Sequence, residues 1–346
     1  MKKFTLYILT AFGLMGLATS CNDFGDVNND PMNLNPGVVD YKMEFTQVEA
    51  QICGSDWDVW RNGCIYTANM IQHTASVDWA YGVFYTWNDQ YSGAYWGGFY
   101  SGGRAAIRNI IDVMNNWEGN PAYANEYQMC RILKAYMFQN MTDLYGDVPY
   151  SEAGQGYSTN PIPYPKYDTQ EAIYNDLLKE LDEAQAALST SAGNTIGAAD
   201  VIYNGDAAKW KKFANSLMLR VAMRLTKVAP DKAKTWVAKA VSNGLFVSND
   251  DNAIVRHTNG SPSDDSAEPY GKVFSSLDTQ AFYISETFIN ILQDDPRLPL
   301  IATVCTRDPK PGWGDADFDL GDNTAAKQKG MPVGYDVSGG DWDLSK

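Results

Sequence analysis

Apolar residues recur at helical spacing through the middle of the chain. Between Asp168 and Leu188 they follow one another at steps of three or four residues, which places them on one face of a helix. These apolar residues are Ile173, Leu177, Leu181, Ala184 and Leu188. Asp168 and Glu171 resemble a capping box at the start, and Gly193 follows the end. The pattern therefore predicts a helix over residues 168–188 with a buried apolar face.

One pair of helices is predicted before this segment and another pair after it. Arg104–Asn116 and Ala122–Tyr145 are separated by a Gly-Asn-Pro turn, and Gly146 follows the second helix. Further on, one helix starts at Gly205-Asp206 and another runs from Pro230 to Gly244. The apolar face of the helix that starts at Gly205-Asp206 consists of Trp210, Phe213, Leu217, Val221 and Leu225.

Antiparallel helix pairs joined by short Gly/Pro turns are the unit of an α-solenoid. The pair within residues 206–243 spans about 38 residues, close to the tetratricopeptide repeat length of about 34. Trp210 and Ala214 stand where the early consensus positions of that repeat would be, although the full consensus is absent. We therefore predict a mostly α fold, in which tetratricopeptide-like helical hairpins (an α-α superhelix) form a scaffold over about residues 41–250.

The pattern changes in the C-terminal part, residues 251–346. Residues 256–272 and 306–346 are rich in Gly, Pro, Asp and Ser, which predicts long loops, with one short helix at Ser285–Leu292 between them. Loops longer than about 15 residues are uncommon in compact domains and are often functional. This part is therefore expected to be irregular.

The N-terminus has the pattern of an export signal. Lys2 and Lys3 precede an uncharged stretch from Phe4 to Leu17, which is shorter than the roughly 20 residues that span a bilayer. Small residues then precede Cys21, as in lipoprotein signals; an ordinary signal peptide with an incidental cysteine is the alternative. We predict a signal peptide over residues 1–20, a lipid on Cys21, a flexible tether over 21–40 and the main domain over 41–346.

Composition and charge narrow the choice of partners. Hydrophobic residues make up 45% of the chain, which is enough for a substantial core. The formal net charge of −15 argues against nucleic acid as a partner and against adhesion to anionic lipid headgroups. Solubility alone would also explain this acidity. The membrane is therefore expected to be contacted through the lipid anchor only.

The remaining cysteines are Cys53, Cys64, Cys130 and Cys305, and their spacing fits no zinc site. Cys53 and Cys64 are the one local pair, and the sequence leaves open whether they form a disulfide. Cys130 falls within a strong helical pattern, so we expect it to be a buried free thiol.

The sequence contains no recognisable catalytic motif. His73 and His257 are the only histidines, neither lies in a metal-binding or nucleophile motif, and no P-loop is present. A carboxylate pair for glycoside hydrolysis stays open, because the chain has 42 acidic residues and nothing singles a pair out. We expect no enzyme activity and no cofactor.

An acidic run from Asp315 to Asp322 partly resembles a calcium loop. Its aspartates alternate like the first ligands of an EF-hand, but Ala326 stands where the bidentate Glu would be. A solvated acidic loop is the favoured interpretation, with calcium binding as the alternative.

Aromatic residues are dense between Trp57 and Tyr100. One set falls at steps of four and is interpreted as a buried helical face: Trp87, Tyr91, Tyr95 and Phe99. Trp79 and Tyr81 instead lie in a segment that is expected to be a loop, where binding residues are often found. In an extended loop their rings would point to the same side. We predict that Trp79 and Tyr81 line a ligand site, with Tyr270 as a third candidate.

Four motifs in order point to one family. They are FGDVNNDP at residues 24–31, LYGDVPYSEA at 144–153, WKKFANSLMLR at 210–220, and SETFI at 285–289 followed by DPRL at 295–298. Together with the lipoprotein signal, they resemble the SusD/RagB family of nutrient-binding outer-membrane lipoproteins, and the similarity covers nearly the whole chain.

The resemblance implies a fold of packed tetratricopeptide-like hairpins with a loop-rich half. It also implies a cell-surface protein that caps a SusC-like TonB-dependent transporter and hands it a glycan or a peptide, without identifying which. Family members usually run longer, so a truncated C-terminal part is expected. The alternatives from other classes are a surface glycosidase or peptidase, and a structural or adhesive surface repeat protein.

Overall fold

The computed structural model describes residues 39–76, 79–101, 106–157, 160–257, 268–273, 282–304 and 321–334. The predicted signal peptide, Cys21 and most of the acidic run Asp315–Asp322 lie outside these ranges. The chain divides into two compact units, Met1–Tyr41 and Lys42–Lys346.

Helices dominate the described residues. The longer ones are α3 (Tyr41–Gln51), η1 (Val59–Ala68), α7 (Ala106–Trp117), α8 (Ala124–Tyr145), α9 (Gln170–Ala187), α10 (Ala207–Arg224) and α11 (Pro230–Asn243). Shorter ones are α4 (Asp56–Asp58), α5 (Asp89–Ser92), α6 (Ala94–Tyr100), α12 (Pro269–Lys272), α13 (Glu286–Leu292) and α14 (Leu298–Ile301). The 3₁₀ turns are η2 (Pro121–Tyr123), η3 (Gln155–Tyr157), η4 (Gly197–Ala199), η5 (Asn249–Asp251) and η7 (Ala325–Lys327).

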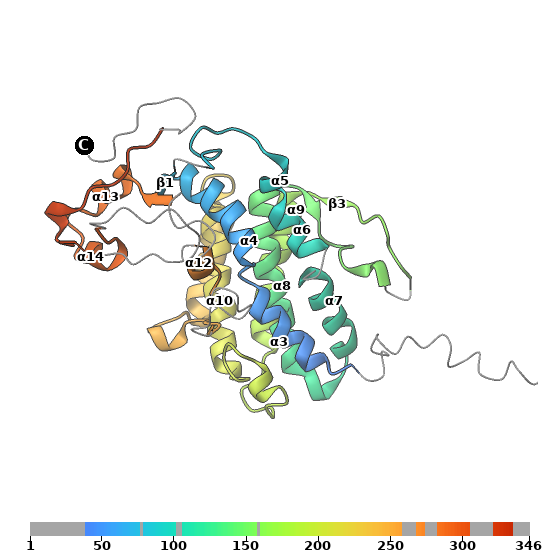
Figure 1. The fold of residues 1–346 in the computed structure, drawn as a ribbon. Coiled ribbons are helices and arrows are strands. Elements are labelled where there is room, and N and C mark those ends of the chain that lie inside the picture. Colours follow the sequence, from blue (N-terminus) through green and yellow to red (C-terminus); the bar gives the residue numbers. More distant parts are fainter. Residues whose placement is uncertain are drawn as a thin grey trace, which may run out of the picture. The chain divides into compact units, whose positions relative to one another are not determined.

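Helices α7 to α11 pack in sequence order, each against the next (Figure 1). We call α7–α11 the helical scaffold. The prediction of a mostly α fold built from helical hairpins is confirmed, and the helices predicted over 168–188, 206–225 and 230–244 are all present.

Helix α9 contains the predicted apolar stripe. Its members Ile173, Leu177, Leu181 and Ala184, with Leu188 at the C-cap, are all buried. The predicted capping box is wrong by one residue, because the side chain of Thr169 accepts the hydrogen bond from the Ala172 N–H. Asp168 instead accepts from the backbone of Tyr150 and Ser151, and thereby holds the chain that precedes α9.

Helix α10 starts as predicted. The Asp206 carboxylate accepts from the N–H groups of Ala208 and Lys209, which a helix N-terminus leaves without partners. Trp210, Leu217 and Val221 are buried, whereas Phe213 and the C-cap residue Leu225 are half-buried. Helix α11 starts at Pro230 and ends at Gly244, whose φ of +96° suits glycine.

Two carboxyl groups meet in the interior between α3 and the start of α10. Asp200 accepts hydrogen bonds from Tyr203 N–H, Gly205 N–H and the Trp210 indole N–H, the last at 2.7 Å. Glu49 of α3 is fully buried and accepts from Val201 N–H at 2.8 Å. Burial, followed by the charge of Asp200, raises the pKa of Glu49 to about 10, so its carboxyl is protonated at neutral pH.

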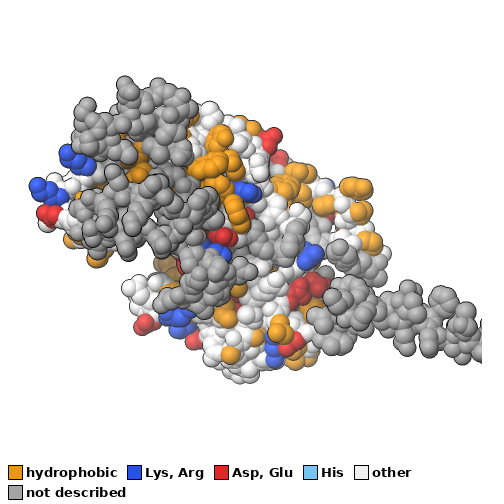
Figure 2. Space-filling model, in the orientation of Figure 1, with side chains coloured by type: hydrophobic (Ala, Val, Ile, Leu, Met, Phe, Trp, Pro, Cys, Tyr) orange, Lys and Arg blue, Asp and Glu red, His pale blue; other side chains and the backbone are white. Residues whose placement is uncertain are grey.

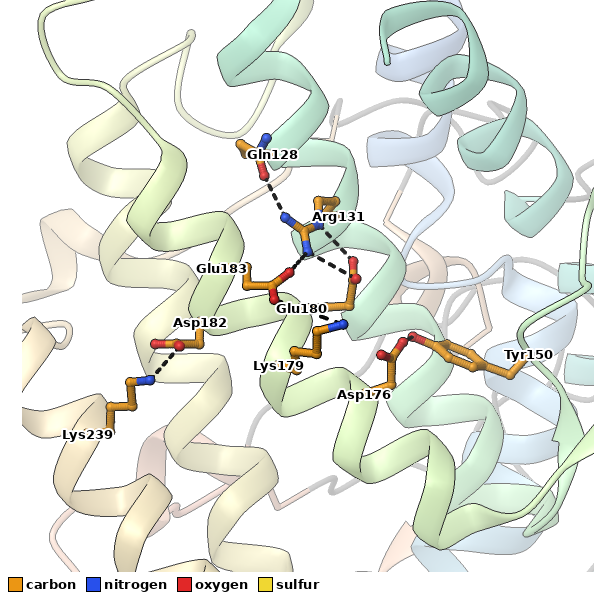
Figure 3. A network of polar contacts seen from close by, with 9 residues as sticks. All are labelled: Gln128, Arg131, Tyr150, Asp176, Lys179, Glu180, Asp182, Glu183 and Lys239. Atoms are coloured by element: carbon orange, nitrogen blue, oxygen red, sulfur yellow. Dashed lines mark hydrogen bonds and ion pairs between the residues drawn. The ribbon is translucent and has the colours of Figure 1, made fainter. Parts of the chain in front are cut away.

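Polar contacts tie the outer faces of three scaffold helices together (Figure 3). Arg131 of α8 donates to both carboxylate oxygens of Glu180 of α9, at 2.8 and 3.0 Å, and to Glu183 at 2.6 Å. Lys239 of α11 pairs with Asp182 on another side of α9. The Arg131 and Glu180 side chains are only 12% and 17% exposed, so this two-bond pair is screened less than a surface ion pair.

Two short sheets join distant parts of the unit. β1 (Thr74–Ser76) pairs antiparallel with β4 (Phe282–Ile284), with Ala75 opposite Tyr283. β2 (Val148–Pro149) pairs antiparallel with β3 (Tyr167–Asp168). The predicted short helix is confirmed as α13, capped by the Ser285 side chain, and the bridge from Ser285 to Met331 adds a second contact. The pairing of β1 with β4 therefore connects the irregular C-terminal part to the segment that follows η1.

Cys53, Cys64 and Cys130 form no disulfide, which answers the open question about a Cys53–Cys64 pair. Cys130 is fully buried, so the prediction for it is confirmed. Within the described ranges, no helix combines the length and apolarity needed to cross a bilayer.

Candidate functional site

A π-helix forms the base of the candidate site. Ser55 and Asp58 cap α4 reciprocally, and the chain continues directly into η1 with a π-helical hydrogen-bond pattern over ten residues. π-Helical turns are rare and are frequently found at functional sites. One side of η1 contributes Trp60, Cys64 and Tyr66 to a buried apolar cluster.

The loop over residues 79–85 is fixed to this helix by close backbone contact. The Gly82 N–H donates to the Ile65 carbonyl at 3.1 Å. A Cβ at position 82 would lie 2.5 Å from the Ile65 oxygen and 2.7 Å from the Tyr66 oxygen, so only glycine permits this approach. Trp79 in the same loop has a φ of +59°, an uncommon conformation for a bulky residue.

Side chains of η1 and the residue after it also hold both flanks of the loop. Asn69, which is buried, donates to the Ser76 hydroxyl and accepts from the Thr74 hydroxyl, both at 2.8 Å. On the other flank, the Tyr66 hydroxyl accepts from the Asn88 N–H at 2.9 Å. The loop is therefore positioned before any ligand arrives.

The buried side chain of Asn62, which also belongs to η1, fixes the positions of α5 and α6. Asn62 donates to the Ser92 carbonyl at 3.0 Å and accepts from the Tyr95 N–H at 2.8 Å. These bonds orient α5 so that Tyr91 packs against the η1 cluster.

The prediction of one helical face from Trp87 to Phe99 is wrong in its first half. The chain breaks at Gly93 between α5 and α6, and Trp87 precedes α5 with 74% of its surface exposed. Tyr95 and Phe99 are buried as predicted. The spacing of four residues continues across the turn at Gly93. The spacing alone therefore cannot reveal that the helix is interrupted there.

Five rings from three segments meet beside η1. We call Trp57, Trp60, Trp79, Tyr81 and Tyr91 the aromatic cluster. The ring centroid of Trp60 lies 5.5 Å from that of Trp57, 5.1 Å from that of Trp79 and 5.7 Å from that of Tyr91, all edge to face. Tyr91 also lies 5.5 Å from both Trp79 and Tyr81. Such geometry is the favoured one for aromatic pairs.

The cluster is buried at its centre and exposed at its edges. Trp60 is 9% exposed, whereas Trp57 is 46% and Trp79 is 36% exposed. Tyr81 and Tyr91 are half-buried. Figure 2 shows hydrophobic side chains grouped on the surface of the molecule. They lie in the region where Figure 1 draws α4 and the ribbon that continues from it. Two large flat side chains are thus offered to solvent on a rigid support.

Arg61 accompanies the rings. Its guanidinium carbon lies 5.2 Å from the ring centroid of Trp57, 5.8 Å from that of Tyr91 and 6.0 Å from that of Trp60. These distances fall within the range of cation–π attraction. The site therefore combines stacking surfaces with one positive charge.

The sequence-predicted residues lie around this helix. Trp79 and Tyr81 both reach Tyr91, although the loop is turned rather than extended as we expected. Tyr270 of α12 is 48% exposed, and its hydroxyl lies 3.2 Å from where a Cβ on Gly63 of η1 would be. Sequence reasoning missed Trp57, Trp60 and Arg61; the clue was two tryptophans three positions apart, followed by a cation.

The chemistry of the cluster suits stacking more than proton transfer. Burial raises the pKa values of Tyr66 and Tyr91, so both hydroxyls stay protonated at neutral pH. Asp56 is bridged to Lys272 at 3.6 Å, and Asp58 is 3% exposed and bound to Ser55. No group of three or more His, Cys, Asp or Glu that could hold a metal occurs among the residues that the structure describes.

A hollow of about 790 Å³ lies where α9, α10 and the α10–α11 turn meet. Several of its polar side chains bind one another: Arg224 donates to the Tyr174 hydroxyl at 2.9 Å and lies 3.0 Å from Asp143, while Lys232 donates to Asn175. These groups satisfy each other, so the hollow carries a weaker indication of a ligand than the aromatic cluster.

Comparison with known proteins shows which family the chain resembles in sequence and in structure. A sequence model of the SusD-like family, described as "Starch-binding associating with outer membrane", matches residues 39–337. A solved chitin-binding protein is 30% identical with a TM-score of 0.70, over 85% of this chain and 60% of its own. No curated protein sequence matches significantly.

Two further solved structures agree. A SusD-like protein labelled Bacteroidetes AC2a is 31% identical with a TM-score of 0.64, over 75% of this chain and 50% of its own. A chitin-binding SusD homologue from Flavobacterium johnsoniae is 25% identical with a TM-score of 0.64, over 86% and 58%. This chain thus spans between half and three fifths of the length of these relatives. The match over residues 39–337 and the shared helical fold show that the chain belongs to the SusD-like family.

Proposed function

We propose that this chain captures a glycan at the cell surface through the aromatic cluster and delivers it to a SusC-like TonB-dependent transporter in the outer membrane. The observation that carries the proposal is the pair of exposed tryptophans, Trp57 and Trp79, each of which packs against the buried Trp60. The family description and the two chitin-binding relatives support a polysaccharide ligand.

The cluster would bind by stacking. Sugar rings have C–H faces that pack on flat aromatic surfaces, and rigid aromatic side chains lose little conformational entropy on binding. Asn62, Asn69 and Gly82 hold the supporting segments in place, so little ordering remains to be done when the ligand arrives. Two exposed rings on one support could each contact one sugar unit of a chain.

Capture followed by delivery favours modest affinity. A ligand that is passed on must also dissociate, and a surface of half-exposed rings forms a shallow site. Nothing in the cluster transfers a proton or forms a bond to the ligand, so the glycan would leave as it arrived. In this proposal Tyr270 adds to the rim, because it lies against the same π-helix at Gly63.

The glycan-binding proposal can be tested on immobilised polysaccharides. We expect the wild-type protein to be retained by at least one glycan of a panel that includes chitin and starch, and the double variant Trp57→Ala/Trp79→Ala to lose that retention. Trp236→Ala is the matched control, since Trp236 is a half-buried tryptophan on α11 with Lys239 over its ring. No retention on any glycan, or equal retention of the double variant, would contradict the proposal.

Attachment to the membrane is proposed to depend on a lipid on Cys21. One acyl chain binds a membrane marginally, whereas two or more hold stably. Expressed with its signal in a bacterium that processes lipoproteins, the Cys21→Ser variant should leave the membrane fraction and appear in the soluble fraction. If that variant still sediments with membranes, the lipid is not the anchor. Co-purification of a TonB-dependent transporter with the wild-type protein would test the partner.

A further inference from the structure

Arg61 differs from several other arginines of the chain, because those arginines form ion pairs with carboxylates. Arg131 is bound to Glu180, Arg224 to Asp143 and Arg297 to Asp295, each at 3.0 Å or less. Within the described ranges, Arg61 takes part in no ion pair or hydrogen bond, and its Nε atom is buried without a partner. Among the residues that the structure describes, no carboxylate pairs with this cation of the site.

The nearby carboxylates are engaged elsewhere. Asp56 faces Lys272 at 3.6 Å, and both side chains are largely buried. Asp58 accepts from the Ser55 N–H at 2.9 Å as part of the α4 cap. Among the described residues, neither of the two acidic residues of α4 forms an ion pair with Arg61.

The surroundings of Arg61 suit an incoming anion. Three rings lie within 6.0 Å of the guanidinium carbon, and they exclude water from much of its surface. A guanidinium is only weakly hydrated, stacks on aromatic faces and presents paired N–H donors that match a carboxylate. A charge in such surroundings without a partner is costly, and an anionic ligand would remove that cost.

We propose that Arg61 makes the aromatic cluster selective for glycans that carry negatively charged sugars, with the sugar ring stacked on an exposed tryptophan and its carboxylate or sulfate bound by the guanidinium. This inference rests on the proposed glycan-binding function and adds the substrate class. The chain as a whole carries a formal charge of −15, which would repel an anionic polymer, so one unpaired cation at the stacking surface is a local exception to that charge.

The selectivity can be tested on an array of polysaccharides arranged as matched sets. Free-acid and methyl-esterified oligogalacturonate differ in charge and in one methyl group per esterified sugar, sulfated and desulfated chondroitin separate the sulfate from the carboxylate, and chitin and starch oligosaccharides are neutral. We expect the wild-type protein to bind a charged member more tightly than its neutral counterpart. Arg61→Met should reduce binding of that member by about tenfold or more, since hydrogen bonds to charged groups are among the strong ones.

Controls separate charge from packing. Arg61→Lys retains the charge and should recover part of the binding, and thermal melts show whether each variant is folded. Arg220→Met is the matched control, because Arg220 is an exposed cation over the ring of Tyr136, which is not a member of the aromatic cluster.

Three results decide the matter. Tighter binding of a charged glycan that Arg61→Met abolishes and Arg220→Met leaves intact supports the selectivity. A neutral glycan as the tightest ligand, unaffected by Arg61→Met but lost in Trp57→Ala/Trp79→Ala, overturns the selectivity and leaves the proposed function standing. If no glycan of any kind binds the wild-type protein, the proposed function itself fails.

Discussion

Two tryptophans show how differently the helical scaffold and the aromatic cluster use the same side chain. Trp210 of α10 is fully buried, and its indole N–H donates to Asp200 at 2.7 Å. Trp79 is 36% exposed, lies on a loop and has a backbone φ of +59°. The first fills the core and satisfies its one polar group there. The second is held near the surface by neighbouring rings, so its exposed face is available to a ligand.

The helical scaffold and the region of the aromatic cluster also differ in backbone conformation. Among the described residues, the non-glycine positions with positive φ are Gln72, Trp79, Tyr85 and Asn204, and three of these lie between η1 and α5. The scaffold helices are long and regular, whereas the cluster rests on a π-helix and two short helices. Strained backbone tends to gather at binding sites, where the surrounding structure enforces it. The scaffold therefore provides stability, and the cluster region uses part of that stability to hold rings at the surface.

The largest expected effect on stability belongs to the scaffold. Leu177→Ala removes a fully buried side chain of α9 and should lower the free energy of unfolding by about 2–5 kcal/mol. Glycan affinity of the folded variant should stay unchanged, because α9 packs against α8 and α10 and Leu177 is not a member of the apolar cluster around η1. Chemical denaturation measures the loss, with Val228→Ala, at a 79% exposed position, as control. A loss no larger than that of the control would mean that the stripe does not stabilise the scaffold.

The buried carboxyl of Glu49 predicts a pH effect that also belongs to the scaffold. Its pKa of about 10 exceeds the ordinary value of 4.5, so the folded protein retains a proton that the unfolded chain releases above pH 4.5. Stability is therefore full below that pH and falls as pH rises toward 10, by about 1.4 kcal/mol per pH unit for this one group.

Glu49→Gln copies the protonated form and should remove this contribution. Unfolding free energies measured between pH 5 and 8 should fall less steeply for the variant than for the wild-type protein. Parallel curves would show that Glu49 does not hold its proton in the folded state. Glycan binding at constant pH should be the same for both proteins, which keeps this effect apart from the cluster.

Gly82→Ala should affect both properties, since Gly82 joins the loop to η1. A methyl group there would lie 2.5 Å from the Ile65 oxygen, so the loop must move and take Trp79 and Tyr81 with it. We expect a stability loss of about 1–3 kcal/mol, as for other overpacked sites, together with weaker glycan binding. Gly97→Ala is the control, because nothing lies within 4 Å of its added Cβ. Unchanged binding in a folded Gly82→Ala variant would show that the position of the loop is irrelevant.

The scaffold could be predicted from the sequence because its information is local. The apolar stripe of α9, the Asp206 cap and the Gly244 stop each follow from residues within one helix. The error of one residue at the α9 cap is of the same kind, since Thr169 and Asp168 both suit that position.

The cluster could be predicted only in part because its members meet through tertiary contacts. Trp79 and Tyr81 stood out as loop aromatics, but their partner Trp60 is brought near by the hydrogen bond from Gly82 to Ile65. The π-helical pattern of η1 and the break at Gly93 leave no mark on apolar spacing, so Tyr91 was interpreted as core. Arg61 was missed because an unpaired cation is recognised only once its neighbours are known.

The most direct test of the account is a joint measurement on Trp79→Ala: calorimetric titration with the glycan that the wild-type protein binds, and a thermal melt of the same sample. The account predicts that affinity falls by about tenfold or more, roughly 1.4 kcal/mol, because an exposed ring is lost from the binding surface. It also predicts that the melting temperature hardly changes, because that ring lies outside the core. Unchanged affinity with a large drop in melting temperature would contradict it and would show that Trp79 serves packing, as Trp210 does.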